Sequence, residues 1–384
     1  MTYDLVTTAT ALQSVVDELL DEPRYAVDTE FHRERTYFPK VALVQLAWPG
    51  RTVLVDPMAV SLEPLSKVLQ GTGLAVLHAS NQDLEVLDLA CGTTPSRLFD
   101  TQIAAGFLGY ASASLASLCE RALRIRLPKG DRLTDWLVRP LTDEQLAYAA
   151  ADVDHLLDIH DWLLERLIEL ERVEWAEDEC EDLRLRGRPE RPPHDAWRRI
   201  KEARQLRGQA FDIARALAAW REERAVKLDQ PVRFVLPDLA LVALAQRAPK
   251  SAQELRGARG VDERHVGGQL ATEILAVIEA ARQNPPPMPE LAPQPELARD
   301  LRPVVPLITA WINQLATELD LDPALLGTRA DVEAELRGDE GGRLSTGWRA
   351  DLLGEPIRQL VGGHAALAYD AGRGLVLDER RRPG

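Results

Sequence analysis

The sequence is poor in cysteine, and no part of it is a long hydrophobic run. Its 384 residues include three cysteines, Cys91, Cys119 and Cys180, which are widely spaced and form no CxxC pair. We therefore expect buried thiols rather than a disulfide framework or a zinc site. No stretch approaches the roughly 18 apolar residues of a membrane span, and the N-terminus lacks the basic and apolar regions of a secretory signal. These absences predict a cytoplasmic protein with no membrane association.

Positive charge is also scarce, because 46 lysines and arginines stand against 61 aspartates and glutamates, for a net charge of −15. Over the whole chain, this balance argues against a simple basic nucleic-acid-binding protein. The acidic excess is uneven, however. Residues 1–189 carry 18 basic and 32 acidic side chains, whereas residues 190–283 carry 17 basic and 13 acidic ones. The middle of the chain is therefore basic within an acidic protein.

Two proline-rich stretches divide the sequence, one at residues 188–193 and the other at residues 284–299. Because proline fixes φ and lacks an N–H group, such stretches disfavour helix and sheet and act as spacers. They separate three segments, which we take as three domains: 1–187, 194–283 and 300–384. Three domains agree with the length of the chain.

The first segment alternates strand and helix patterns, which predicts an α/β domain with a mixed sheet. Residues 41–48 are apolar on both faces, as in a strand that is covered on both sides. From Thr142 a capping signature begins a long helix that we expect to reach about Arg172. The other two segments show helical periodicity, including one helix over residues 196–223. We expect both to be small helical bundles.

Four acidic residues and one tyrosine occur in an order that suggests metal-dependent chemistry. Asp28 and Glu30 share one side of an extended strand, since they are two residues apart. Asp83 follows a later strand, and Tyr148 and Asp152 lie on one face of a helix, four residues apart. Clustered carboxylates repel one another unless cations hold them together. Two Mg²⁺ or Mn²⁺ ions held by oxygen ligands could clamp the attacking and leaving oxygens of a phosphodiester.

Each of these features has an ordinary explanation when it is taken alone. An Asp-x-Glu pair is common, an acid such as Asp83 often caps a helix N-terminus, and Tyr148 with Asp152 is compatible with any amphipathic helix. The functional interpretation depends on all of them occurring together and in this order along the chain.

That order resembles the tyrosine branch of the DEDD exonuclease superfamily, and the flanking sequences resemble the ribonuclease D family. The histidine branch would place its histidine where this chain has Ala147. The middle segment resembles an HRDC (helicase and RNase D C-terminal) domain, and the last segment resembles a second, divergent HRDC-like domain. The motifs that carry the resemblance are residues 27–31, 36–40, 43–46, 78–84, 135–136, 139–141 and 148–152, with 220–225 and 234–238 for the HRDC domain and 347–349 and 353–354 for the last segment.

The resemblance implies a ribonuclease H-like α/β exonuclease domain with a mixed sheet, followed by two all-α HRDC-type helical domains. It also implies a metal-dependent 3′→5′ exoribonuclease that releases nucleoside 5′-monophosphates in the 3′ maturation of tRNA precursors and other small stable RNAs. The chain would act as a monomer on single-stranded RNA 3′ ends. Tyr148 would orient a metal-activated water, because an ordinary tyrosine pKa near 10 makes it a poor base. The ligands of two Mg²⁺ or Mn²⁺ ions would be Asp28, Glu30, Asp83 and Asp152.

Several further residues are candidates for RNA contacts. Phe31 and Trp136, together with Tyr37 and Phe38, could stack on bases near the 3′ end. Basic side chains could contact phosphates without reading sequence. Those of the middle segment would lie on the helix expected over residues 196–223, unless they form a solvated face paired with nearby acids. The basic candidates are Lys129, Arg132, Arg198, Lys201 and Arg204.

Two other functions remain open at the level of sequence. A DNA 3′→5′ exonuclease would use the same five catalytic residues, because discrimination against DNA needs contacts to the 2′-hydroxyl. A non-catalytic RNA-binding scaffold could also retain the exonuclease fold, although the intact set of five residues argues against it. The sequence contains no GxxxxGK[ST] motif, which argues against an accompanying helicase.

Overall fold

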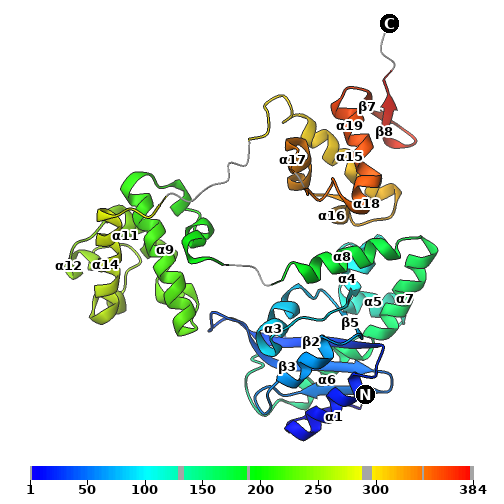
Figure 1. Ribbon diagram of the computed structural model, residues 1–384, viewed down its shortest axis with the longest axis horizontal. Coiled ribbons are helices and arrows are strands. Elements are labelled where there is room, and N and C mark those ends of the chain that lie inside the picture. Colours follow the sequence, from blue (N-terminus) through cyan, green and yellow to red (C-terminus); the bar gives the residue numbers. More distant parts are fainter. Residues whose placement is uncertain (1, 129–133, 188–190, 288–295, 340, 381–384) are drawn as a thin grey trace.

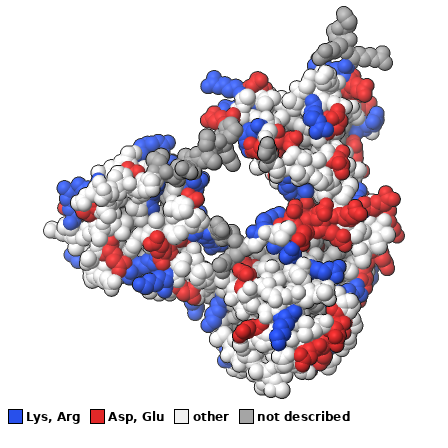
Figure 2. All heavy atoms as spheres, in the orientation of Figure 1, with Lys and Arg blue, Asp and Glu red and all other residues white. Residues whose placement is uncertain are grey.

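The computed structural model describes residues 2–128, 134–187, 191–287, 296–339 and 341–380. They form an N-terminal α/β body, a middle helical body and a C-terminal body (Figure 1). In the space-filling view the three bodies surround an opening, and acidic side chains gather over helix α8, Val173–Leu185 (Figure 2). No helix in the described ranges is both long and apolar enough to cross a membrane.

The N-terminal body is built on a six-stranded sheet in the order β1-β4-β3-β2-β5-β6. Strands β2, β3 and β4 pair antiparallel, whereas β1 with β4, β2 with β5, and β5 with β6 pair parallel. The expected mixed sheet is therefore confirmed. The strands are β1 Asp4–Val6, β2 Arg24–His32, β3 Lys40–Trp48, β4 Arg51–Val55, β5 Leu74–Leu77 and β6 Leu98–Asp100.

Helices cover both faces of this sheet, which is why β3 is apolar on both sides. On one face, the side chains of Tyr25 and Val27 pack with α1 and α3. On the other face, Leu43 and Leu54 pack with α6, while Ala26 joins a core with α4, α5 and α7. The helices are α1 Ala9–Leu19, α2 Ser66–Leu69, α3 Asn81–Cys91, α4 Thr101–Gly106, α5 Leu115–Ala122, α6 Asp143–Asp154, α7 Leu156–Glu169 and α8 Val173–Leu185, with a 3-10 turn η1 at Glu63–Leu65.

The long helix expected from Thr142 to Arg172 is wrong, because the helix breaks at His155. The capping box at Thr142 and Gln145 forms as predicted, but His155 leaves helical geometry, with φ −113° and ψ 2°. The break lets α6 pack on the sheet while α7 packs against α4 and α8. Periodicity does not reveal such a change of direction when both halves are amphipathic.

The middle body has a hydrophobic core of its own. The helix predicted over residues 196–223 is wrong at its N-terminal end, since α9 begins at Gly208. The backbone is extended at Ile200 and Leu206. Trp197, in a 3-10 turn, and Ile200, which ends that turn, pack into the core. The elements are the 3-10 turns η2 Pro193–Arg199 and η3 Ala203–Gln205, and the helices α9 Gly208–Leu228, α10 Val232–Val235, α11 Asp238–Arg247, α12 Ala252–Arg256, α13 Glu263–Val266 and α14 Gly268–Gln283.

The C-terminal body is helical, as expected, but it ends in an antiparallel hairpin that the all-α expectation did not include. The hairpin turn is closed by Asp370, whose Oδ1 accepts hydrogen bonds from the amides of Gly372 and Arg373. Gly374 supplies the positive φ of 80° that ends the turn. The elements are α15 Val304–Glu318, α16 Pro323–Leu326, α17 Arg329–Arg337, α18 Gly347–Arg349, a π-helical turn η4 Ala350–Gly354, α19 Glu355–Val361, β7 Ala365–Asp370 and β8 Gly374–Glu379.

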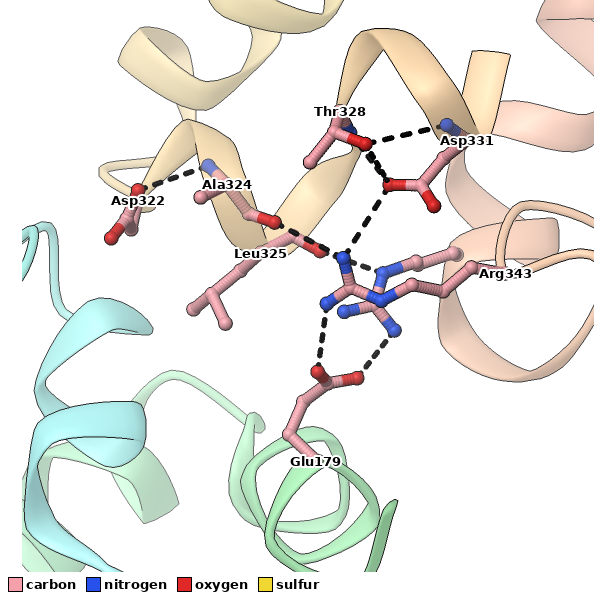
Figure 3. Close-up of polar contacts among 8 residues, drawn as sticks. Glu179, Asp322, Ala324, Leu325, Thr328, Asp331 and Arg343 are labelled. Carbon is pink, nitrogen blue, oxygen red and sulfur yellow. Dashed lines mark hydrogen bonds and ion pairs between the residues drawn. The ribbon is translucent and has the colours of Figure 1, made fainter. Parts of the chain in front are cut away.

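The C-terminal body shares a continuous core with the N-terminal body. The rings of Trp175 and Trp348 stack with their centroids 4.9 Å apart, and Phe107 lies against Trp348. The Glu179 carboxylate of α8 forms an ion pair of 2.9 Å with Arg343, and the same guanidinium lies 3.6 Å from the Asp331 carboxylate (Figure 3). Arg349 also pairs with Glu179. These ion pairs favour this arrangement of the two bodies, because removal of one partner would leave the other buried charge unpaired.

Candidate active site

Strand β2 places two acids on the face of the sheet that α6 covers. Side chains alternate along a strand, so Asp28 and Glu30 point to this face, whereas Thr29 points to the opposite face with Tyr25 and Val27. The pairing of β2 with β3 shifts register between Glu30 and Phe31. This irregularity ends the regular strand directly after the second acid.

Helix α6 brings Tyr148 and Asp152 over these acids. The small residues Ala149 and Ala150 are buried and pack against β3 and β4, so the helix lies close to the sheet. Tyr148 and Asp152 share one face, as their spacing predicts, and the Tyr148 hydroxyl donates a hydrogen bond to the Asp152 carboxylate.

Asp83 comes from α3, where it is the third residue of the helix and not its N-cap, which is Ser80. The turn before α3 is fixed by Asp100, which accepts hydrogen bonds from the amides of Ala79 and Ser80 at 3.2 and 2.7 Å. Asp83 is 7% exposed, and its Oδ1 accepts a hydrogen bond of 2.5 Å from the Thr29 hydroxyl.

The structure brings three of the four predicted acids into one group. Carboxylate oxygens of Asp28, Glu30 and Asp152 all lie within 4.8 Å of one another. Asp83 is outside this group of three, but it lies close enough that its charge raises the pKa of both Asp28 and Glu30. The four side chains therefore form one electrostatic unit, with Asp83 at its edge.

Burial and mutual repulsion disfavour the ionised forms of these acids. Burial raises the pKa of Asp28 well above its usual range, and the charges of the other three acids raise it further. Burial and then the charges of Asp152 and Asp83 raise the pKa of Glu30 to about 8. Burial also raises the pKa of Asp83 and of Asp152 to about 6, although a side-chain hydrogen bond opposes the rise at each.

This donor set fits divalent cations. In the part of the chain that the structure describes, none of the four acids forms a salt bridge with lysine or arginine. Closely spaced carboxylates without such partners need protons or cations to be stable. The available ligands are oxygens only, which is the chemistry that Mg²⁺ and Mn²⁺ prefer.

Tyr148 is unsuited to act as a base. Burial raises its pKa above the ordinary value of 10.0, and the nearby charges of Asp152 and Glu30 raise it further. Its hydroxyl therefore keeps its proton at neutral pH and can donate or accept a hydrogen bond. Trp136 packs beside it, with ring centroids 6.1 Å apart, and restricts its position.

A cleft of about 1240 Å³ opens over the acids. Phe31 and Trp136, two of the predicted base-stacking residues, line it together with Glu30, Tyr148 and Asp152. Trp136 is 8% exposed, so it presents little of its surface to the cleft. The two predicted phosphate contacts Lys129 and Arg132, which precede Trp136 in the sequence, lie outside the described residues.

Sequence reasoning missed three arginines that line the same cleft, Arg33, Arg35 and Arg126. Each is held near an acid: Arg33 lies 2.9 Å from Glu85, Arg35 4.0 Å from Asp135, and Arg126 3.1 Å from Glu120. The guanidinium of Arg33 also lies 5.2 Å from the centre of the Phe31 ring. The run His-Arg-Glu-Arg, which follows Phe31 just after the acid pair, was a signal that could have indicated two of them.

The predicted basic residues of the middle segment do not line the cleft. They lie on the short turns before α9 and not on one helix. Arg198 pairs with Asp195 at 2.7 Å, as the solvated-face alternative expected. Lys201 and Arg204 are exposed, and their role in RNA binding stays a prediction.

The predicted stacking residues Tyr37 and Phe38 do not line the cleft either; they contact the middle body. The Tyr37 hydroxyl donates a 2.5 Å hydrogen bond to buried Glu222 of α9. Asp229 accepts from the amides of Tyr37 and Phe38 at 3.0 and 3.1 Å. The middle body thus holds the loop that carries Arg33 and Arg35 to the cleft.

Comparison with known proteins assigns both domain types. Residues 3–168, which include all five predicted catalytic residues, match the profile of the 3′-5′ exonuclease family. Residues 210–278 match the HRDC domain.

Ribonuclease D of Acidiphilium cryptum (strain JF-5) is 34% identical over 97% of both chains. The chain belongs to the ribonuclease D family. Ribonuclease D of Escherichia coli (strain K12) is also 34% identical, over 94% of this chain and 99% of its own.

Solved structures agree with membership of the ribonuclease D family. The crystal structure of Escherichia coli RNase D superposes with a TM-score of 0.81 and covers 95% of this chain and 100% of its own, at 34% identity. The catalytic core of RRP6 from Trypanosoma brucei has a TM-score of 0.62 and 25% identity, and covers 73% of this chain and 80% of its own. The expected α/β exonuclease domain followed by a helical HRDC domain is confirmed, as is the expected class of enzyme, a 3′→5′ exoribonuclease.

Proposed function

We propose that this member of the ribonuclease D family removes nucleotides one at a time from RNA 3′ ends and releases nucleoside 5′-monophosphates, using two divalent cations. The single observation that carries the proposal is the group of Asp28, Glu30 and Asp152 within 4.8 Å. Two of these acids, Glu30 and Asp152, line a cleft together with Tyr148. Asp83 is the fourth proposed ligand. The oxygen-only donor set favours Mg²⁺ or Mn²⁺ over softer metals.

The chain's own residues then have distinct tasks. Bound cations supply an activated water and stabilise negative charge on the leaving 3′ oxygen. The four acids hold those cations, and the protonated Tyr148 hydroxyl orients the attacking water. Phe31 and Trp136 contact the terminal bases. Arg33, Arg35 and Arg126 bind phosphates by exchanging their acidic partners for the RNA backbone.

The substrate class and the state of the protein are also proposals. The Escherichia coli enzyme is described as an exoribonuclease involved in structured RNA processing, which supports tRNA precursors and other small stable RNAs as substrates here. We propose a monomer, because one chain would supply all three domains of the enzyme. With such substrates the protein would work in the cytoplasm. We propose the boundaries 1–187, 194–283 and 300–384 for its domains, with Arg198, Lys201, Arg204, Lys129 and Arg132 as further RNA contacts.

Degradation of end-labelled RNA tests the catalytic assignment. Asp28→Asn and Asp152→Asn should each abolish metal-dependent shortening of single-stranded RNA, while circular dichroism shows an intact fold. Asp154→Asn is a matched control, because Asp154 lies on the same helix but outside the group of three acids. Full activity in either of the first two variants would contradict the assignment.

The same assay on DNA of equal length separates the remaining alternatives. Faster loss of DNA than of RNA would favour a DNA exonuclease. Binding of RNA without any shortening, with Mg²⁺ or Mn²⁺ present, would favour a non-catalytic scaffold.

A further inference from the structure

Thr29 makes a contact that the proposed chemistry does not use. It lies between Asp28 and Glu30, but its side chain points to the opposite face of β2. There it is 5% exposed, and its hydroxyl lies 2.5 Å from Oδ1 of Asp83. A threonine hydroxyl has one proton to donate, so this bond fixes its direction.

The limited pairing of β2 explains how Asp83 can reach both Thr29 and the acid cluster. β2 pairs with β5 only from Arg24 to Ala26. Beyond Ala26, no strand in the described ranges pairs with this edge, and α3 packs beside it. Asp83 therefore approaches from the face opposite α6. It meets the other acids across an edge that no neighbouring strand covers.

The backbone amides of Thr29 and Asp83 also favour the ionised Asp83 carboxylate, and the Thr29 hydroxyl is the side-chain donor that holds it. When Asp28 and Glu30 are ionised, they carry charge of the same sign as Asp83, which favours rotation of its side chain away from them. A buried carboxylate also requires hydrogen-bond partners. The Thr29 hydroxyl supplies such a partner from the side away from α6, so one carboxylate oxygen is held on that side.

We propose that Thr29 is a positioning residue that holds Asp83 toward the acid cluster and thereby strengthens binding of a second divalent cation. This inference rests on the metal-binding role proposed above for the four acids. Partners that orient metal-binding side chains typically change metal affinity by about 10- to 100-fold. Thr29 would act in this way through Asp83, without contact to the cation or the substrate.

Calorimetric titration of Mn²⁺ into the full-length protein, without RNA, tests this role. Thr29→Val removes the donor and keeps the shape. Thr29→Ser and Thr29→Ala differ from each other only in the hydroxyl, so they keep the test valid if the valine variant does not fold. We expect Val and Ala to weaken the lower-affinity Mn²⁺ site by about 10- to 100-fold, and Ser to retain most of the affinity.

Thr52→Val is the matched control. Thr52 is also buried in the sheet, at 7% exposure, and its hydroxyl donates a 3.0 Å hydrogen bond to Asp154, which is outside the acid cluster. This variant loses the same kind of bond and should bind Mn²⁺ as the unmodified chain does. Thermal unfolding of each metal-free variant measures any loss of folding stability separately from the change in Mn²⁺ affinity.

The outcomes distinguish this inference from the proposed function. If the unmodified chain binds no Mn²⁺, the proposed function fails and this inference fails with it. If the unmodified chain binds two ions and Thr29→Ala binds them equally well, only the role of Thr29 is overturned. Equal weakening by the Ser and Ala variants, or by Thr52→Val, would also overturn it, because the hydroxyl at position 29 would then not be the cause.

Discussion

At the scale of single residues, the acids of the cluster can be neutralised either by protons or by cations. In the folded chain, burial and the neighbouring charges raise the pKa of Glu30 from its ordinary value of 4.5 to about 8. The metal-free folded state therefore binds more protons than the unfolded state between these values. Its stability consequently falls as the pH rises through this window. Divalent cations replace the protons and should reverse the loss.

This competition predicts a pH-dependent response to Mg²⁺. We expect the cation to raise the melting temperature more at pH 8 than at pH 6, because the protons on Glu30, Asp83 and Asp152 that compete with it are fewer at pH 8. Differential scanning calorimetry of chelator-treated protein, with and without Mg²⁺, measures both shifts. Asp152→Asn serves as the control and should show a reduced shift at both pH values. An equal shift of the unmodified chain at both pH values would contradict the prediction.

Tyr148 permits a second prediction at this scale. Tyr148→Phe removes the hydroxyl and keeps the ring against Trp136, so we expect the single-turnover rate of RNA shortening to fall by about 100-fold, with Mn²⁺ affinity nearly unchanged. Because the pKa of Tyr148 is raised, the rate of the unmodified enzyme should show no ionisation of this residue near neutral pH. Loss of metal affinity in the phenylalanine variant would argue against a role in orienting water.

The residues at the centre of the site could be predicted from sequence because their spacing fixes their directions. Two-residue spacing on β2 and four-residue spacing on α6 each align two side chains, whatever the rest of the fold does. The contact of Thr29 with Asp83 could not be predicted in this way. It depends on where the pairing of β5 with β2 ends, and no local pattern encodes that position.

At the scale of elements, the loop between β2 and β3 both lines the cleft and contacts the middle body. It carries Arg33 and Arg35 into the cleft, and a few residues later Tyr37 bonds to Glu222 of α9. Burial and the hydrogen bond to Glu222 raise the pKa of Tyr37 to about 12, so its hydroxyl remains a donor. The middle body therefore influences the cleft through the position of this loop.

Glu222→Gln should weaken that link. Gln is a poorer acceptor for the Tyr37 hydroxyl than a carboxylate and cannot pair with Arg199, which lies 2.7 Å from Glu222. We expect the KM for RNA to rise several-fold, with little change in kcat, because the acids on β2 and α6 are not displaced. Steady-state kinetics measure both constants. The neighbouring Glu223 is exposed, so Glu223→Gln is the control. A fall in kcat at unchanged KM would contradict this account.

Several element boundaries could not be predicted from sequence patterns. The capping box at Thr142 was predicted correctly because it depends on neighbouring residues. The break at His155 and the late start of α9 at Gly208 were not, because both depend on the direction in which a helix must pack. The β7–β8 hairpin was missed because its strands are partly exposed and lack a buried apolar run.

At the scale of the whole molecule, the last body is part of the catalytic body's core, although the sequence separates them by more than a hundred residues. Trp348 is 5% exposed and stacks on Trp175 of α8. Trp348→Ala should lower the free energy of unfolding by about 3–5 kcal/mol. Urea unfolding measures this loss, and Tyr369→Ala, at a position 76% exposed, should have little effect. A loss of similar size in both variants would contradict the shared core.

The distribution of charge was easier to predict than the arrangement of the bodies. Counting charges along the sequence located the acidic excess in the first segment, and the structure displays much of it over α8 (Figure 2). The shared core was not predictable, because Trp175 and Trp348 each belong to an ordinary helical pattern in their own segment. Only the folded chain brings them together.

The short pairing of β2 with β5 has a consequence for how this fold can change. A longer β5 would continue the ladder of hydrogen bonds along this edge, beside which α3 now packs. The same extension would take the space through which Asp83 meets Asp28, and the sheet would then exclude one of its own proposed ligands. The sheet stays incomplete where the chemistry is assembled, so substitutions that complete it should gain stability and lose the site.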